Sequence, residues 1–117
     1  YYPEVLFSEA MRVLKPGGLI ITMCPAWDHN YRIYFEDFTH RTPFMKCSLH
    51  DFHILIGLQK VETEFFKQLP FCWNNLAGYL ITECIRLLPL GFLKQKSKLI
   101  KFSKETMILS TGVKSDA

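Results

Sequence analysis

Residues 27–41 hold the side chains best suited to chemistry in this sequence. His40 is the candidate catalytic residue, as a general base or as a group that orients a substrate, because histidine exchanges protons near neutral pH. Arg41 can bind a phosphate or carboxylate of a substrate through paired donors, or form a surface salt bridge. Asp37 is a candidate substrate contact. In the alternative, Asp37, Thr39 and His40 bond one another and the backbone, and so hold the shape of the loop.

Aromatic side chains crowd the same segment and offer a surface for a substrate. Trp27 and Tyr34, with Tyr31 and Phe35 beside them, either line a substrate pocket or cover a sheet. The sequence leaves both interpretations open. His29 is a further candidate for a direct role, which we rank below His40.

The remaining histidines and the cysteines do not form a metal site. His50 and His53 are three residues apart on an expected helix, but no third ligand accompanies them. The cysteines are scattered, without a CxxC pair: Cys24, Cys47, Cys72 and Cys84. We therefore predict no metal, and four reduced, mostly buried thiols in a cytoplasmic protein.

The elements that position these residues begin with an amphipathic helix over residues 3–14, whose expected apolar face is Leu6, Ala10, Val13 and Leu14. Pro16 and Gly17 then predict a tight turn with positive φ at the glycine. Residues 19–24 form a continuous apolar run, typical of a strand buried on both faces of a parallel sheet. Residues 25–47 follow as a loop. It leaves the carboxyl end of the strand, where ligands bind in open α/β sheets.

A second helix is expected over residues 48–57, with Ser48 as N-cap, Asp51 in a variant of the capping box, and Gly57 as its stop. A strand over 61–69, a helical insert over 71–102 and a last strand over 106–113 complete the chain.

Residues 9–21, E-A-M-R-V-L-K-P-G-G-L-I-I, closely resemble a segment of class I S-adenosylmethionine-dependent methyltransferases. In that family a helix ending in R-V-L-K-P-G-G leads into the fifth strand of the sheet. Residues 37–44, D-F-T-H-R-T-P-F, are similar to the D-P-T-H-x-x-P-F segment of one branch of the family. Phe38 stands where that segment has proline.

The resemblance implies an α/β fold: the last three strands of a Rossmann-like methyltransferase sheet, in the order 5-7-6, with flanking helices. The last strand would insert antiparallel beside the fifth. The whole chain, 1–117, would be the C-terminal half of the domain. Gly17 and Gly18 are the only adjacent glycines, no G-x-G occurs, and the chain begins at Tyr1. We therefore expect a fragment that has no cofactor-binding residues and binds no S-adenosylmethionine alone.

The function implied is the acceptor side of an enzyme that moves a methyl group from S-adenosylmethionine to a small-molecule or glycan acceptor. His40 would be the base for a hydroxyl acceptor. The fragment alone is expected to be inactive. Nucleic acid is not an expected partner, because the net charge is only +3 and the basic residues are mostly dispersed.

Two alternatives come from other classes of protein. The chain could be a non-catalytic interaction module whose sheet edge is completed by a partner. It could also be a membrane-peripheral binding protein that uses residues 87–104, where lysines alternate with apolar residues. No run of about 18 uncharged apolar residues predicts a spanning helix.

Overall fold

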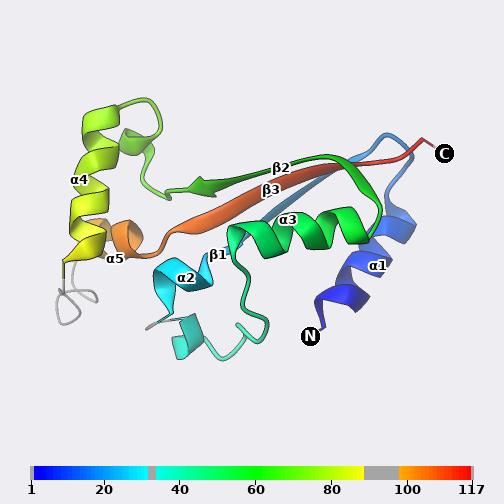
Figure 1. Ribbon diagram of the computed structural model, residues 1–117, viewed down its shortest axis with the longest axis horizontal. Helices are drawn as coiled ribbons and strands as arrows, with labels where there is room; N and C mark the ends of the chain where they lie inside the picture. The colour runs from blue at the N-terminus through cyan, green and yellow to red at the C-terminus, as the bar shows by residue number, and fades with distance from the viewer. Residues whose placement is uncertain (1, 32–33, 89–97, 117) are drawn as a thin grey trace.

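The computed structural model describes residues 2–31, 34–88 and 98–116. It contains a three-stranded sheet with helices along one side and a helical unit at one end (Figure 1). The helices are α1 (Pro3–Val13), α2 (Trp27–Asn30), α3 (Lys46–Leu55), α4 (Leu76–Leu87) and α5 (Lys98–Lys104). The strands are β1 (Leu19–Pro25), β2 (Leu58–Phe66) and β3 (Met107–Lys114). The chain is therefore α/β, as predicted.

The first helix, the turn and the first strand lie where the sequence placed them. Pro3 occupies the first turn of α1, where its missing N–H has no helical partner. Gly17 has φ of 76°, a backbone conformation that residues with a side chain rarely adopt. Its N–H donates to the carbonyl of Lys114 at 3.0 Å, so the turn is tied to the end of β3.

The last strand lies between the other two, and the sheet order is β1-β3-β2. Both neighbours pair antiparallel to β3: Thr22 and Thr63 each lie opposite Ser110. Because β1 and β2 both run against β3, they run in the same direction. Their carboxyl ends therefore lie at the same end of the sheet, where β3 begins.

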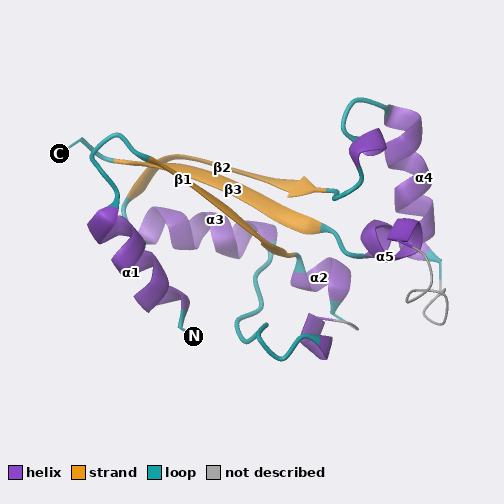
Figure 2. Ribbon diagram, turned by 180° about the vertical axis from the view of Figure 1, so that it is seen from behind, coloured by secondary structure: helices purple, strands orange, loops and turns teal. Residues whose placement is uncertain are grey.

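One face of the sheet carries the core. Figures 1 and 2 show α1 and α3 on the same side of the strands. Leu49 of α3 packs with Ala26 and Ile108, all fully buried. Phe7 is the one buried residue that α1 contributes, and it meets Phe52 of α3 edge to face at 5.2 Å.

The expected apolar face of α1 is wrong. Leu6 and Val13 are each more than 60% exposed. The helix touches the rest of the chain mainly through Phe7 rather than along a stripe. On α3, Leu49 is buried, Leu55 is exposed and His53 takes a place in the core.

The prediction that β1 is buried on both faces is also wrong. Its side chains alternate, and Leu19, Ile21 and Met23 are 55%, 65% and 48% exposed. Thr22 contacts His53 of α3, so the alternation of the strand places these three residues on the opposite face, over which Figure 2 shows no described helix. β1 also pairs with β3 alone among the described strands. We call this surface, formed by Leu19, Ile21, Met23 and the free edge of β1, the open β1 face.

The second strand begins and ends three residues earlier than predicted, at Leu58 and Phe66 rather than 61 and 69. Lys60 has φ of 51°, and the pairing of β2 with β3 shifts between Gln59 and Glu62. This irregularity bends the edge of β2. Lys67 follows the strand and is buried.

The predicted loop over residues 25–47 is more ordered than a plain connection. It contains α2 and a short 3₁₀ turn, Tyr34–Glu36, and α3 begins inside it at Lys46. Ser48 is not the N-cap; Met45 is. The Ser48 hydroxyl instead accepts the Met45 N–H at 2.8 Å. Asp51 has no capping contact, and Gly57, with φ of 94°, ends the helix region as expected.

The helical insert contains a 3₁₀ turn, Pro70–Cys72, then α4 and α5. Asn75 caps α4, because its Oδ1 accepts the N–H groups of Ala77 and Gly78. Residues 89–97 of the predicted insert lie outside the described residues. No helix in the described ranges combines the length and apolar character needed to cross a membrane.

The cysteines are free, as expected, but only Cys72 is buried. Cys47 and Cys84 are exposed, so the expectation of mostly buried thiols is wrong.

Candidate functional site

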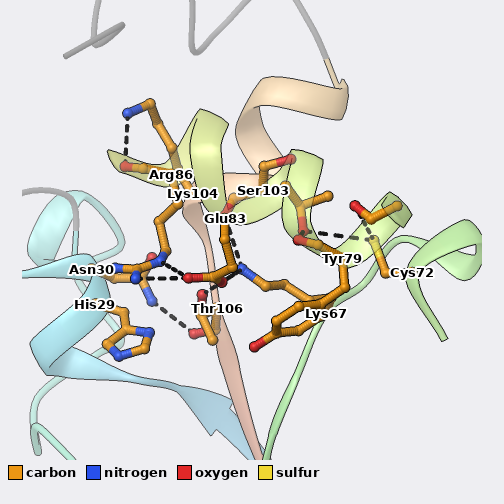
Figure 3. A network of polar contacts seen from close by, with 12 residues as sticks. His29, Asn30, Lys67, Cys72, Tyr79, Glu83, Arg86, Ser103, Lys104 and Thr106 are labelled. Carbon is orange, nitrogen blue, oxygen red and sulfur yellow. Dashed lines mark hydrogen bonds and ion pairs between the residues drawn. The ribbon is translucent and has the colours of Figure 1, made fainter. Parts of the chain in front are cut away.

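A cluster of polar side chains lies where β1 and β2 end and β3 begins (Figure 3). We call it the carboxyl-end cluster. Its members come from α2, the end of β2, α4, α5 and the residue before β3: His29, Asn30, Lys67, Glu83, Arg86, Ser103 and Thr106. The shared direction of β1 and β2 brings these segments to one end of the sheet.

Lys67 lies at the centre of the cluster and is 4% exposed. Its ammonium group is 2.5 Å from Oε1 of Glu83. It also donates to the Thr106 hydroxyl at 3.2 Å and the Ser103 carbonyl at 3.4 Å. An ammonium group has three donors, so each is used. A buried lysine needs such pairing, because an unpaired charge out of water is costly.

Glu83 joins Lys67 to Arg86. Its second oxygen, Oε2, accepts from Arg86 Nε at 3.0 Å and from Arg86 Nη2 at 2.8 Å. Burial raises the pKa of Glu83, but the hydrogen bonds and charges of Arg86 and Lys67 outweigh that effect. The net pKa lies below the ordinary value, so Glu83 is ionised at neutral pH.

Asn30 ties α2 to the start of β3. Its amide nitrogen donates to the carbonyls of Ala26 at 2.9 Å and Thr106 at 2.7 Å. Its Oδ1 is buried and has no partner among the described residues.

His29 stacks on Phe65 of β2, with ring centroids 4.6 Å apart. Burial lowers the pKa of His29, and the positive charge of Arg86 lowers it further. The ring is therefore mostly neutral at pH 7. Its buried Nδ1 also has no partner in the part of the chain that the structure describes.

Asp37 and His40, which were singled out from the sequence, lie outside this cluster, in the loop after α2. Asp37 accepts from the backbone N–H of Thr39 at 2.9 Å and from its hydroxyl at 2.6 Å. These bonds lower the pKa of Asp37. His40 Nδ1 lies 2.9 Å from the Tyr34 carbonyl, and its Nε2 is 3.8 Å from Asp37. These contacts match the alternative interpretation, in which Asp37, Thr39 and His40 bond one another and the backbone and so hold the shape of the loop.

Tyr34, Trp27 and Arg41 do not converge with His40 on one pocket. Tyr34 is buried and its hydroxyl donates to the Thr42 carbonyl at 2.7 Å, while its ring lies beside His40. Trp27 is partly exposed beside Tyr31. Arg41 is exposed and has no hydrogen bond or ion pair with the described residues.

The sequence did not single out Asn30, Lys67, Glu83 or Arg86. Two signals were present. Lys67 is a lone charge after the apolar end of a strand, and Glu83 and Arg86 are three apart on an amphipathic helix. Nothing in the sequence shows that the strand end and the helix meet.

His53 and Ser110 have the spacing of a nucleophile and its base, with 2.8 Å between Ser110 Oγ and His53 Nδ1. His53 Nε2 also lies 3.2 Å from the Thr22 hydroxyl. Both His53 and Ser110 are fully buried, so a substrate has no access to them. We assign this pair to the core. No group of three potential metal ligands occurs in the described ranges.

The turn between α1 and β1 does not form a cradle for a ligand. The one pair of adjacent glycines, Gly17 and Gly18, lies at the amino end of β1, opposite the carboxyl-end cluster. The Gly17 N–H is used by Lys114, and a Cβ on Gly18 would meet Leu14 at 2.6 Å. These glycines serve the turn and its packing, and do not leave a backbone cradle for a ligand.

No protein-family model matches the chain, and neither a curated protein nor a solved structure is found to be similar to it. The functional interpretation therefore depends on the residues and their arrangement.

Proposed function

We propose that this chain is the acceptor-side part of a methyltransferase that uses S-adenosylmethionine and acts on a small-molecule or glycan acceptor. The observation that carries the proposal is the sheet order, in which the last strand lies antiparallel between β1 and β2. This arrangement supports the order 5-7-6 that the resemblance of residues 9–21 implies. A Rossmann-like sheet would continue beyond β1.

The open β1 face supports this continuation. Leu19, Ile21 and Met23 are exposed, and β1 has a free edge without a charged residue. The edge of β2, in contrast, has a bulge and carries Glu62 and Glu64. Bulges and charges protect an edge from pairing, so the unprotected edge is the one suited to another strand.

In the proposed enzyme, the chemistry available to this chain is positioning of the acceptor and removal of its proton. His40 Nδ1 faces a carbonyl and so donates to it, which leaves the lone pair of the neutral ring on Nε2. That nitrogen is the one able to accept a proton from an acceptor hydroxyl.

The encoding sequence upstream of Tyr1 tests the proposal. We expect an open reading frame with a strand followed by G-x-G, and we expect the extended protein to bind S-adenosylmethionine. In that protein His40→Gln should lower kcat for a hydroxyl acceptor without weakening binding of the methyl donor. An extended protein that does not bind the donor, or the lack of an upstream frame, contradicts the proposal.

The open β1 face also favours a second candidate, an interaction module that pairs its free edge with a partner strand. Ile21→Lys places a charge on that face without touching the core. In the module it abolishes association of the 117-residue chain, measured by analytical ultracentrifugation. If the chain is instead part of the proposed enzyme, Ile21→Lys prevents the extended protein from folding. The membrane-peripheral alternative falls on residues 87–104, of which 89–97 lie outside the described residues, and it stays a prediction.

A further inference from the structure

We infer that Arg86 anchors an oxyanion-binding site in the carboxyl-end cluster, and that the site takes the carboxylate or phosphate group of a small molecule. The inference depends on the geometry around Arg86 and not on methyl transfer. It would hold for an enzyme and for a binding module alike.

The unused donors of Arg86 give the site its specificity. A guanidinium has five N–H donors in a rigid fork. Glu83 Oε2 takes the donors along one edge, from Nε and Nη2. The remaining donors, on Nη1 and the outer side of Nη2, have no partner among the described residues. This end of the fork matches the spacing of two oxygens of a carboxylate or phosphate.

The free end of Arg86 is held in a fixed direction. Lys67 has all three donors occupied, and one of them holds Glu83. Glu83 in turn holds Arg86 through two hydrogen bonds. Lys67 and Glu83 therefore act as positioning residues. Pre-ordering of this kind reduces the entropy lost when a ligand binds.

The charge of the cluster favours an anion. In this triad two cations, Lys67 and Arg86, face one carboxylate, Glu83. Burial lowers the pKa of His29, so its ring is mostly neutral at pH 7. The excess positive charge lies in a mostly covered place, where electrostatic attraction is stronger than in bulk water. Arg86 is 21% exposed, so an ion from solvent can reach it.

Two unpaired polar atoms lie on the same side as the guanidinium. In Figure 3, Arg86 reaches down beside Asn30 and His29, and Lys67 approaches Glu83 from the other side. Asn30 Oδ1 is an acceptor without a donor, in a residue that is 4% exposed, and His29 Nδ1 is equally unpaired. A hydroxyl or amine next to the anionic group of the ligand would satisfy Asn30.

The test is an NMR titration of the ¹⁵N-labelled 117-residue chain with inorganic phosphate and, separately, with acetate. Sodium chloride at equal ionic strength is the background. We expect the Arg86 Nε–H signal to shift saturably with at least one anion. The tighter anion identifies the ligand group as phosphate or carboxylate.

In the Arg86 variants, binding is followed through the backbone amide signals of α4, because the Arg86 Nε–H signal is lost. Arg86→Gln should weaken binding of the anion about tenfold or more, as expected when charge-assisted hydrogen bonds are lost. Arg12→Gln is the matched control. Arg12 pairs at 2.8 Å with Glu9, three residues earlier in the chain, as Arg86 pairs with Glu83, but both Arg12 and Glu9 are exposed on α1. The Arg12→Gln variant should leave the affinity unchanged. Arg86→Lys keeps the charge and removes the fork, and should also weaken binding.

Two results overturn the inference. The first is a wild-type Arg86 signal that does not saturate with either anion. The second is an Arg86→Gln or Arg86→Lys variant that binds the anion with the same affinity as the wild-type chain. If Arg86→Gln fails to fold, the wild-type titration and Arg86→Lys decide the question.

Discussion

The ammonium group of Lys67 lies 2.5 Å from Oε1 of Glu83, while the Lys67 side chain is only 3% exposed. The pair joins the end of β2 to α4, two segments between which the chain turns through Pro70–Cys72. It therefore holds the helical insert against the sheet.

Lys67→Met should lower the free energy of unfolding by about 3 kcal/mol, because removing one partner leaves a partly buried carboxylate poorly paired. Urea denaturation followed by circular dichroism measures the change. Adding Glu83→Gln to Lys67→Met should cost less than the sum of the two single changes. Additive costs in that double-mutant cycle would show that the two side chains do not interact.

Stability should fall as the pH falls below about 6.5, the ordinary pKa of histidine. Burial lowers the pKa of His53, and the nearby His50 lowers it further; burial also lowers the pKa of His29. The unfolded chain then binds more protons than the folded chain between the lowered pKa values and 6.5. Stability in that window therefore rises with pH and is fully present above it. Thermal unfolding at pH 8 and pH 5.5 measures the difference.

His53→Gln should flatten part of this pH dependence. The amide can still bond to Thr22 and Ser110, and it does not titrate. His50→Gln is the control, since the His50 side chain is 38% exposed and is only the second cause of the lowered pKa of His53. An unchanged pH profile in His53→Gln would contradict the assignment.

Asn75→Ala should destabilise the chain by about 1 kcal/mol, the usual cost of losing a helix N-cap. Asn75 Oδ1 accepts the Ala77 N–H at 3.0 Å, at the start of the helix that carries Glu83 and Arg86. Asn74→Ala is the matched control, because Asn74 is exposed and has no side-chain bond to the described residues. Equal losses of stability in the two variants would argue against the cap.

The four thiols should react with a disulfide reagent in two classes at pH 8. Cys47 and Cys84 are exposed and should react within the dead time of a manual assay. Burial raises the pKa of Cys24 to about 11, so its reactive thiolate is scarce at pH 8. Cys72 is buried. We expect two equivalents of fast reaction and two more only after urea is added; four fast equivalents would contradict the fold around Cys24 and Cys72.

Local elements were predictable from the sequence because they depend on local rules. Pro3 at a helix start, Gly17 in a turn and Gly57 at a helix end each reflect a φ preference that neighbours do not change. The strand bounds of β1 were predicted within one residue. Those of β2 were shifted, because Lys67 looks like a continuation of the strand when its ion pair with Glu83 is not known.

Only part of the candidate site could be predicted from the sequence. Asp37, Thr39 and His40 were recognised because they are neighbours in the chain, and the structure shows them bonded to one another and to Tyr34. Their role in catalysis stays a prediction. Except for His29, the carboxyl-end cluster was missed, because its members lie between residues 29 and 106 and most come from segments distant from one another in the sequence.

The sequence by itself determined the α/β class, the order of the three strands with the helices α1 and α3, and the turn at Gly17, since φ preferences and side-chain periodicity act over a few residues. Only the tertiary structure decided which surfaces are covered. The apolar run in β1 predicts a strand but not its neighbours, and Ile21 is exposed because no described segment packs over it. Likewise, the charge of Arg86 was visible in the sequence, but its direction depends on Glu83 and Lys67, which long-range packing brings to it.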